Sequence, residues 1–128
     1  MKIHDLKFNS LVSYEKRPIT LERIDPTDIW GRYGGDLNNK VCRPELADLR
    51  GIPLTEKILL DSGFSYYENI AKFYHNDSCS ISFVNGKVSR FEACTERGTI
   101  IMKDMEYVHN LQNAFYFATG HELEITIK

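Results

Sequence analysis

Several features that would assign a function at once are missing from the sequence. It contains no run of about 18 apolar residues, so no membrane-spanning helix is predicted. Charged residues interrupt the positions after Met1, so a secretory signal is not expected. Neither the G-x-G-x-x-G nor the Walker pattern of phosphate-binding loops occurs, and no internal repeat, low-complexity tract or linker is visible. These absences leave an ordinary globular protein as the expectation.

A strongly basic balance is also missing. The formal net charge is -2, whereas a protein that mainly grips a phosphate backbone would be expected to carry an excess of Lys and Arg. The 128 residues are 42% hydrophobic and 27% charged, which is typical of a soluble domain. We therefore predict a single domain over residues 1–128, with nucleic acid not expected as its main partner.

Paired cysteine motifs are absent too. Cys42, Cys79 and Cys94 are an odd number without close spacing, which favours free thiols in a reducing, cytoplasmic compartment. Cys79 and Cys94 are predicted to share the apolar face of one hairpin, where a buried thiol is unreactive. We expect a structural role for all three.

No metal-binding or catalytic spacing is recognisable. The four histidines and three cysteines form no C-x-x-C, H-x-x-x-H or H-E-x-x-H pattern, so no metal and no cofactor are predicted. An enzyme is the less favoured interpretation, although a site assembled from distant residues remains an open alternative.

The longest helical pattern covers residues 103–120. Asp104 is suited to cap its start and Gly120 to end it in a left-handed conformation. Apolar side chains recur at steps of three and four residues along one side, namely Met105, Val108, Leu111, Phe115 and Ala118. Because strand-like segments flank it, this helix is predicted to cover a sheet.

A second, shorter helix is predicted from Thr55 to Gly63. Thr55 is a natural N-cap, and Leu54 and Leu59 can form a hydrophobic staple around it. Gly63 supplies the positive φ that ends a helix, with Phe64 folding back on Leu59. Both ends are therefore specified, and the helix is expected to join two sheets.

The residues before this helix read as strands. Residues 1–33 hold three apolar, strand-like runs, with Arg17-Pro18 as a predicted turn and with Ile19, Leu21 and Arg23 on one strand face. Residues 29–33 form the third run, closed by residues 34–36, and residues 41–42 are a further short strand. Short strands and tight turns predict a small, strongly bent sheet or SH3-like barrel.

Strands also dominate the second half. Asn85-Gly86 predicts a hairpin over residues 79–91 with a two-residue turn, although pairing of Ile81 with Phe91 through a longer loop remains open. Residues 99–102 and the alternating residues 122–127 are further predicted strands. The predicted class is α+β: a strand-rich, SH3-like first half, a short linking helix, and an antiparallel sheet covered by one C-terminal helix.

Three segments match motifs of one protein family. Residues 52–64 read IPLTEKILLDSGF and are similar to the motif IPLTEEWLLKFGF. Residues 107–123 read YVHNLQNAFYFATGHEL and are similar to YVHQLQNLYFALTGEEL, whereas residues 6–12 match the opening motif only weakly because Asn9 and Ser10 replace its glycine and asparagine. On these motifs the chain resembles a family of small uncharacterised proteins of Bacteroidota phages and mobile elements, a resemblance that implies an origin rather than an activity.

Trp30, Arg32 and Tyr33 form the first candidate binding site. An indole and a guanidinium two residues apart share one strand face, where a ring can stack on a base and a cation can meet a phosphate. Lys40 and Arg43 follow on a polar stretch and add positive charge. The alternative places Trp30 in the barrel core and Arg32 at its rim.

His109, Gln112 and Asn113 form the second candidate site, on one flank of the C-terminal helix. Amides and an imidazole can read a planar ligand or a partner's backbone. The favoured alternative is that they cap strand ends and satisfy buried backbone groups.

From these observations we expect a non-enzymatic accessory protein that counters host defence in the host cytoplasm. It would bind and sequester a nucleotide-like signal or dock on a defence protein, as a homo-oligomer. The remaining hypotheses are a nucleic-acid-binding accessory factor that uses the small barrel and a small hydrolase with a scattered site.

Overall fold

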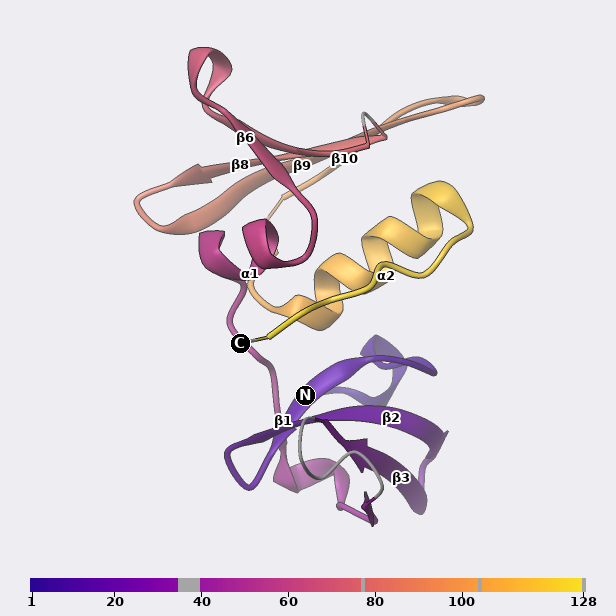
Figure 1. Ribbon diagram of the computed structural model, residues 1–128. Coiled ribbons are helices and arrows are strands. Elements are labelled where there is room, and N and C mark those ends of the chain that lie inside the picture. Colours follow the sequence, from indigo (N-terminus) through magenta and orange to yellow (C-terminus); the bar gives the residue numbers. More distant parts are fainter. Residues whose placement is uncertain (35–39, 77, 104, 128) are drawn as a thin grey trace. The chain divides into compact units, whose positions relative to one another are not determined.

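The chain forms two compact units, Met1–Ile52 and Pro53–Lys128, each with its own sheet. The structure is a computed structural model that describes residues 1–34, 40–76, 78–103 and 105–127 (Figure 1). Two antiparallel sheets of five strands and one long C-terminal helix confirm the α+β class. The single-domain organisation stays a prediction.

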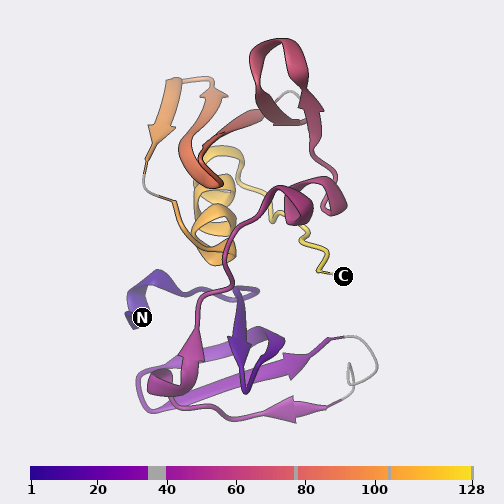
Figure 2. The ribbon, with the colours of Figure 1, turned by 90° about the vertical axis from the view of Figure 1, so that its left-hand side faces the viewer.

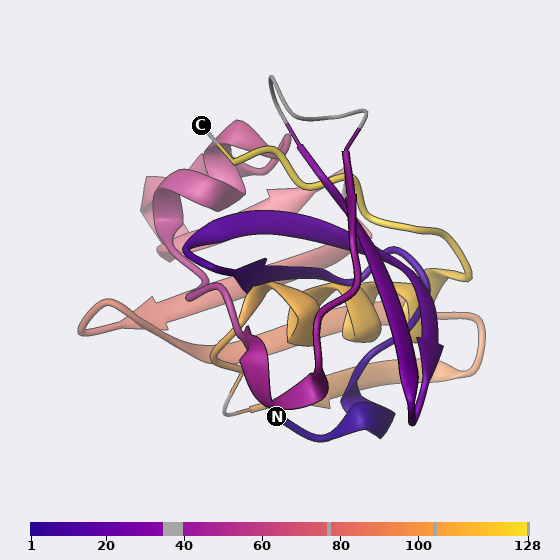
Figure 3. The ribbon, with the colours of Figure 1, turned by 90° about the horizontal axis from the view of Figure 1, so that it is seen from below.

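The first unit is a curved sheet with the strand order β4-β3-β2-β1-β5 (Figure 3). Its strands are β1 (Leu11–Tyr14), β2 (Arg17–Asp25), β3 (Asp28–Tyr33), β4 (Val41–Cys42) and β5 (Leu49–Arg50). In the described part of this unit, 3₁₀ turns cover Ile3–Asp5, before β1, and Leu46–Asp48, between β4 and β5. The core consists of buried aliphatic side chains, namely Leu6, Val12, Ile19, Leu21, Ile29 and Leu49.

The β1–β2 turn is not at Arg17-Pro18, as predicted, but at Glu15-Lys16. Both turn residues have positive φ, 50° and 66°, which is the backbone of the tight hairpin turn that suits two twisted strands. Pro18 lies inside β2 opposite Ser13. The sequence pattern misled because proline marks turns more often than strand interiors.

An extra residue in β2 changes which side chains face the core. Leu21 pairs with Gly31 and Arg23 pairs with Trp30, so Glu22 has no partner of its own in the ladder and forms a β-bulge. Ile19 and Leu21 are fully buried, as predicted, whereas Arg23 is exposed. The expectation that Arg23 shares their face was wrong, because the bulge shifts the alternation by one residue.

The second unit is an antiparallel sheet with the strand order β10-β9-β8-β7-β6, and α2 lies against one of its faces (Figures 1 and 2). Its strands are β6 (Ser65–Tyr67), β7 (Lys72–His75), β8 (Cys79–Val84), β9 (Lys87–Thr95) and β10 (Gly98–Met102). Its helices are α1 (Glu56–Asp61), α2 (Val108–Thr119) and the 3₁₀ turn Glu68–Ile70. Fully buried residues of the sheet and of α2 form the core, among them Ile81, Phe91, Val108 and Leu111.

Both predicted ends of α1 are confirmed. The Thr55 hydroxyl accepts a hydrogen bond from the Ile58 amide at 3.2 Å, as an N-cap does. At the other end Gly63 has φ +96°, and the Phe64 amide donates to the Leu59 carbonyl at 3.0 Å. Local sequence alone therefore specifies this helix.

The β8–β9 hairpin combines the two registers that were considered. Asn85 and Gly86 form the predicted two-residue turn with φ of 54° and 78°, and Phe83 pairs with Val88. Ser89 is then an extra residue in β9, so that Ile81 nevertheless pairs with Phe91.

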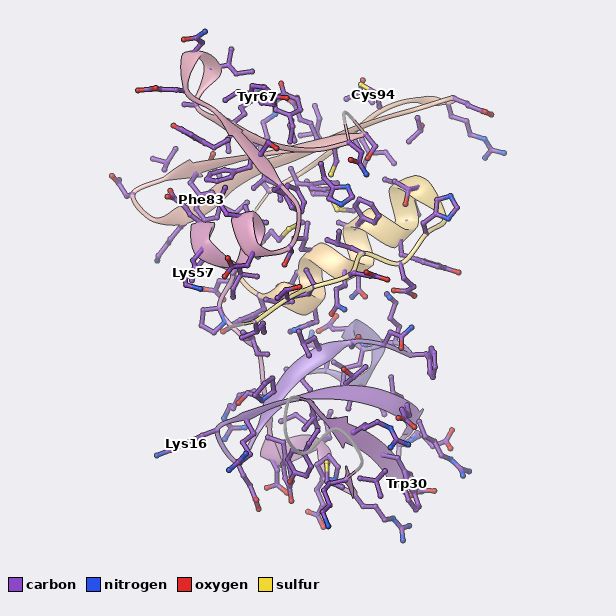
Figure 4. All side chains as sticks on the ribbon, viewed as in Figure 1. Lys16, Trp30, Lys57, Tyr67, Phe83 and Cys94 are labelled. Atoms are coloured by element: carbon purple, nitrogen blue, oxygen red, sulfur yellow. The ribbon has the colours of Figure 1, made fainter. Side chains whose placement is uncertain are left out.

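This bulge also determines where the two hairpin cysteines lie. Cys79 pairs with Ala93 and is buried, whereas Cys94 is exposed on the face of the sheet opposite α2 (Figure 4). The prediction that both share one apolar face was wrong, because it assumed regular alternation through β9.

The C-terminal helix begins later than predicted. α2 starts at Val108, the Tyr107 amide donates to the Asn110 side chain at 2.9 Å, and the predicted cap Asp104 lies outside the described residues. Gly120 ends the helix with φ +75°, as predicted.

The final predicted strand is not formed. Residues 122–127 pair with no strand, although Leu123 is buried. The Thr126 amide instead donates to the Ser62 hydroxyl at 2.9 Å. Residues 122–127 therefore form an extended segment that lies outside the sheet. The buried Leu123 side chain and the hydrogen bond from Thr126 to Ser62 hold it in place.

Gly31 provides a test of the packing in the first unit. A Cβ at Gly31 would lie 2.8 Å from the Ile19 Cδ1 in a fully buried side chain, so we expect Gly31→Ala to destabilise the unit by about 1 kcal/mol. Thermal unfolding followed by the fluorescence of Trp30, the single tryptophan, measures this unit directly. Gly34→Ala is the matched control, because nothing lies within 4 Å of its Cβ. Equal melting temperatures for the two variants would contradict the prediction.

Candidate functional site

Trp30 and Arg32 project from the outward face of β3, as the alternation of this strand predicts. The alternate residues Ile29 and Gly31 are buried, while Arg32 is exposed and Trp30 is half-buried. Tyr33 takes the inward parity and packs against the core of the first unit. The structure therefore brings Trp30 and Arg32 together on one face and separates Tyr33 from them.

Asp28 is the centre of the contacts on this face. Its Oδ1 accepts a hydrogen bond from the Trp30 Nε1 at 2.8 Å and another from the Arg43 Nη2 at 3.0 Å. The Arg43 guanidinium lies over the Trp30 ring, with its Cζ 4.6 Å from the ring centroid, in a cation–π contact. One face of the indole is thus already covered by a side chain of the same unit.

The other arginines of this face are also paired with carboxylates. Arg23 Nε lies 2.9 Å from the Asp25 Oδ2 and 3.4 Å from the Asp28 Oδ2. Arg32 Nε donates to the Glu22 Oε1. The five outward residues Arg23, Trp30, Arg32, Val41 and Arg43, with the acidic partners Glu22, Asp25 and Asp28, are called the Trp30 face below.

The charges of the Trp30 face balance. Three arginines face three carboxylates, so the face has no net formal charge. Apolar area comes from Trp30 and from Val41, which lies opposite Arg32 in the register and is 50% exposed. A neutral face with an indole and an aliphatic side chain differs from a phosphate-binding surface, where cations are left for the ligand.

Arg43 also controls the titration of Asp28. Its hydrogen bond lowers the pKa of the Asp28 carboxyl, burial opposes this shift, and the Trp30 hydrogen bond and the charge of Arg23 add to the lowering. Because the folded pKa is depressed, the resulting stabilisation is present above the ordinary pKa of about 3.9 and is lost as the pH falls below it.

Of the two basic residues predicted to extend the site, Arg43 contacts Trp30 and Asp28, whereas Lys40 does not belong to the Trp30 face. Lys40 is exposed, and its backbone carbonyl accepts a hydrogen bond from the Tyr33 amide at 3.0 Å. Its ammonium has no described contact with Trp30 or Asp28. Of the predicted loop residues, 35 and 36 lie outside the described part of the chain.

Two of the three polar residues predicted on this flank of α2 are buried. His109 and Gln112 are only 3% and 4% exposed, and Asn113 is half-buried. The His109 ring stacks on Tyr107 with an interplanar angle of 7°. An external ligand has little access to His109 and Gln112, so their placement favours the structural interpretation over a ligand-binding one. Asn113 differs, because it lines a hollow of about 370 Å³ together with Met102 and Phe117.

Three hollows are found in the described part of the chain. In the first unit a hollow of about 480 Å³ is lined by Phe8, Glu22 and Ile24 among others. In the second unit hollows of about 760 and 370 Å³ lie beside β10. Trp30 lines none of these three, and of the Trp30 face only Glu22 lines one of them, so Trp30 lies on an open surface rather than in the wall of one of these pockets.

The described residues hold no group of three metal-ligating side chains, and none of their helices is long and apolar enough to cross a membrane. Burial raises the pKa of the Cys79 thiol to about 12, which keeps it protonated and unreactive. Burial likewise raises the pKa of Cys42.

Sequence reasoning missed Asp28. The signal was present, because Asp28 stands two residues before Trp30 and therefore on the same strand face. The strand was predicted to begin only at Ile29, which left Asp28 in the preceding turn.

Comparison of the chain with protein-family models, with curated proteins and with solved structures gave no match. The resemblance to proteins of Bacteroidota phages therefore rests on the sequence motifs alone.

The first prediction from this site concerns Asp28 and Arg43. Arg43→Ala removes the strongest cause of the lowered pKa, so we expect the pKa of Asp28 to rise toward its ordinary value. Carboxyl chemical shifts followed by NMR during an acid titration measure it. Arg50→Ala is the control, since Arg50 donates to the Ala47 carbonyl and not to Asp28. An unchanged Asp28 pKa in Arg43→Ala would contradict the arrangement.

A second prediction concerns thiol reactivity. At pH 8 we expect Cys94 to react first with an aromatic disulfide reagent, since it is exposed, whereas Cys79 reacts only after unfolding. Cys94→Ser should remove the fast phase and Cys79→Ser should leave it. Because Cys42 is half-buried and could also react, the register is tested by Cys79: a fast phase that persists in Cys94→Ser and is lost in Cys79→Ser would show that the hairpin register is different.

Proposed function

We propose that this chain is a non-enzymatic accessory protein of phage or mobile-element origin that counters host defence by docking on a defence protein in the host cytoplasm. The motif resemblance supports the origin. The Trp30 face supports the mode of action, because tryptophan and arginine are the residues most enriched where protein interfaces concentrate their binding energy.

The observation that carries the proposal is the internal neutralisation of the Trp30 face. A nucleotide-like signal needs unpaired cations for its phosphates and an open ring for its base. Here each arginine has a carboxylate partner, and Arg43 covers the indole. A protein surface can instead use mixed charges around an apolar centre, because such pairs form the polar rim of ordinary interfaces.

The architecture of the first unit supports a small SH3-like barrel as the scaffold. Its strand order β4-β3-β2-β1-β5 joins the first and last strands, and the 3₁₀ turn Leu46–Asp48 lies between β4 and β5. The alternation of β3 then holds Trp30 outward on a packed strand. A rigid anchor of this kind loses little conformational entropy on binding.

The proposal is tested by measuring whether the chain inhibits a bacterial defence system. The chain is expressed in bacterial strains that each carry one cloned defence system, and the plating efficiency of a restricted phage is measured. We expect restored plating on at least one strain. Trp30→Ala should lose it, because removing a central tryptophan typically costs on the order of 2 kcal/mol of binding, or about thirtyfold.

Phe8→Ala is the matched control, since Phe8 is an exposed aromatic side chain of the first unit and is not part of the Trp30 face. Calorimetric titration with cyclic oligonucleotides and ADP-ribose derivatives separates the two modes of action. If one of these compounds gives a binding heat with the wild type and none with Trp30→Ala, sequestration of a signal rather than docking on a protein is the mode of action. Equal activity of wild type and Trp30→Ala would refute a role for this face.

A further inference from the structure

β10 is an open edge of the second sheet (Figure 2). It pairs with β9 on one side, and no strand lies on its other side in the described part of the chain. A strand at a sheet edge presents a row of unpaired backbone N–H and C=O groups, which can pair with another extended segment.

The side chains of β10 offer no protection against such pairing. Its five residues, Gly98 to Met102, contain no charged residue and no proline, and Ile101 is 47% exposed. The other edge strands are shorter: β6 has three residues, and β4 and β5 have two each. Short or charged edges are the usual devices that prevent association, and β10 has neither.

An apolar part of α2 lies next to this edge. Phe117 is 72% exposed, the highest value among the large apolar side chains that the structure describes. It lines the 760 Å³ hollow together with Thr99 and Ile100, and the 370 Å³ hollow together with Met102. Phe117 therefore lies alongside β10 on the helix-covered face and extends the apolar edge into a broader strip.

We propose that the second unit associates with a second copy of this chain by antiparallel pairing of β10 with β10 of the other copy. A two-fold axis perpendicular to the sheet joins the two sheets into one of ten strands and places both α2 helices on the same face. The exposed Phe117 side chains then lie on the side where the two copies meet. This proposal is independent of the proposed function, which uses the first unit.

The composition of the strip favours a second copy over another partner. Antiparallel self-pairing brings each residue opposite itself or a close neighbour, so a charged strand would face like charges. β10 carries none, and hence no repulsion arises within the paired strands. The same absence leaves an acidic or basic peptide no charge to recognise, whereas Phe117 of one copy finds an equivalent apolar surface on the other.

Sedimentation velocity from micromolar to millimolar concentration tests association. We expect a monomer–dimer equilibrium with a dissociation constant in the micromolar range, because pairing of one short strand and one helix flank makes a small interface. A chain that remains monomeric up to millimolar concentration would overturn the proposal.

Substitutions locate the interface. Ile101→Lys places like charges near each other across the two-fold axis, so the dissociation constant should rise by about tenfold or more. Phe117→Ser should weaken the dimer as well. Val84→Lys is the matched control, because Val84 is an exposed aliphatic residue at the far end of β8 and not at this edge. Far-UV circular dichroism and melting temperatures establish that each variant is folded.

Hydrogen exchange distinguishes edge pairing from any other dimer. Backbone amides of β10 should become more protected as the protein concentration rises, and Ile101→Lys should abolish that dependence. A dimer whose β10 amides exchange at the same rate at all concentrations, or one weakened by Val84→Lys as much as by Ile101→Lys, would overturn the proposal.

Discussion

Burial of one sheet face under α2 is the constraint on which the second unit depends. Val108 and Leu111 of the helix and Ile81 and Phe91 of the sheet are fully buried, and each such side chain contributes about 1.5 to 3 kcal/mol of hydrophobic stabilisation. A single helix covers one face only and does not protect the sheet edge. The same packing that stabilises the unit therefore leaves the β10 edge open.

In the first unit, the carboxylates of the Trp30 face neutralise the arginines around Trp30. A half-buried indole beside three arginines could bind anions and aromatic rings of many kinds, yet here Asp28 accepts hydrogen bonds from Trp30 and Arg43 through the same oxygen. The carboxylate fixes both donors and removes the excess positive charge. Such a preorganised, neutral group favours recognition of one shaped surface over unspecific binding to polyanions.

Local sequence patterns predicted the helix ends and the hairpin turn correctly, because all the residues that determine them are close together in sequence. They did not predict which strand residues are exposed, because one extra residue in a strand shifts the alternation of its side chains. Thr55 and Gly63 specify both ends of α1, and Asn85-Gly86 specifies the β8–β9 turn. The exposure of Arg23 and Cys94 could not be predicted, since no local pattern marks the extra residues. The partners of Trp30 were likewise hidden, because Arg43 reaches Asp28 across 15 positions of sequence.

The two β-bulges have a consequence for how such a chain can vary. Glu22 and Ser89 each add one residue to a strand without breaking the hairpin that contains it. Beyond each bulge, the residues that meet solvent and those that meet the core are exchanged relative to a regular strand. Loss or gain of a single codon at these two places would thus redraw the exposed surface, while the arrangement of strands stays as it is.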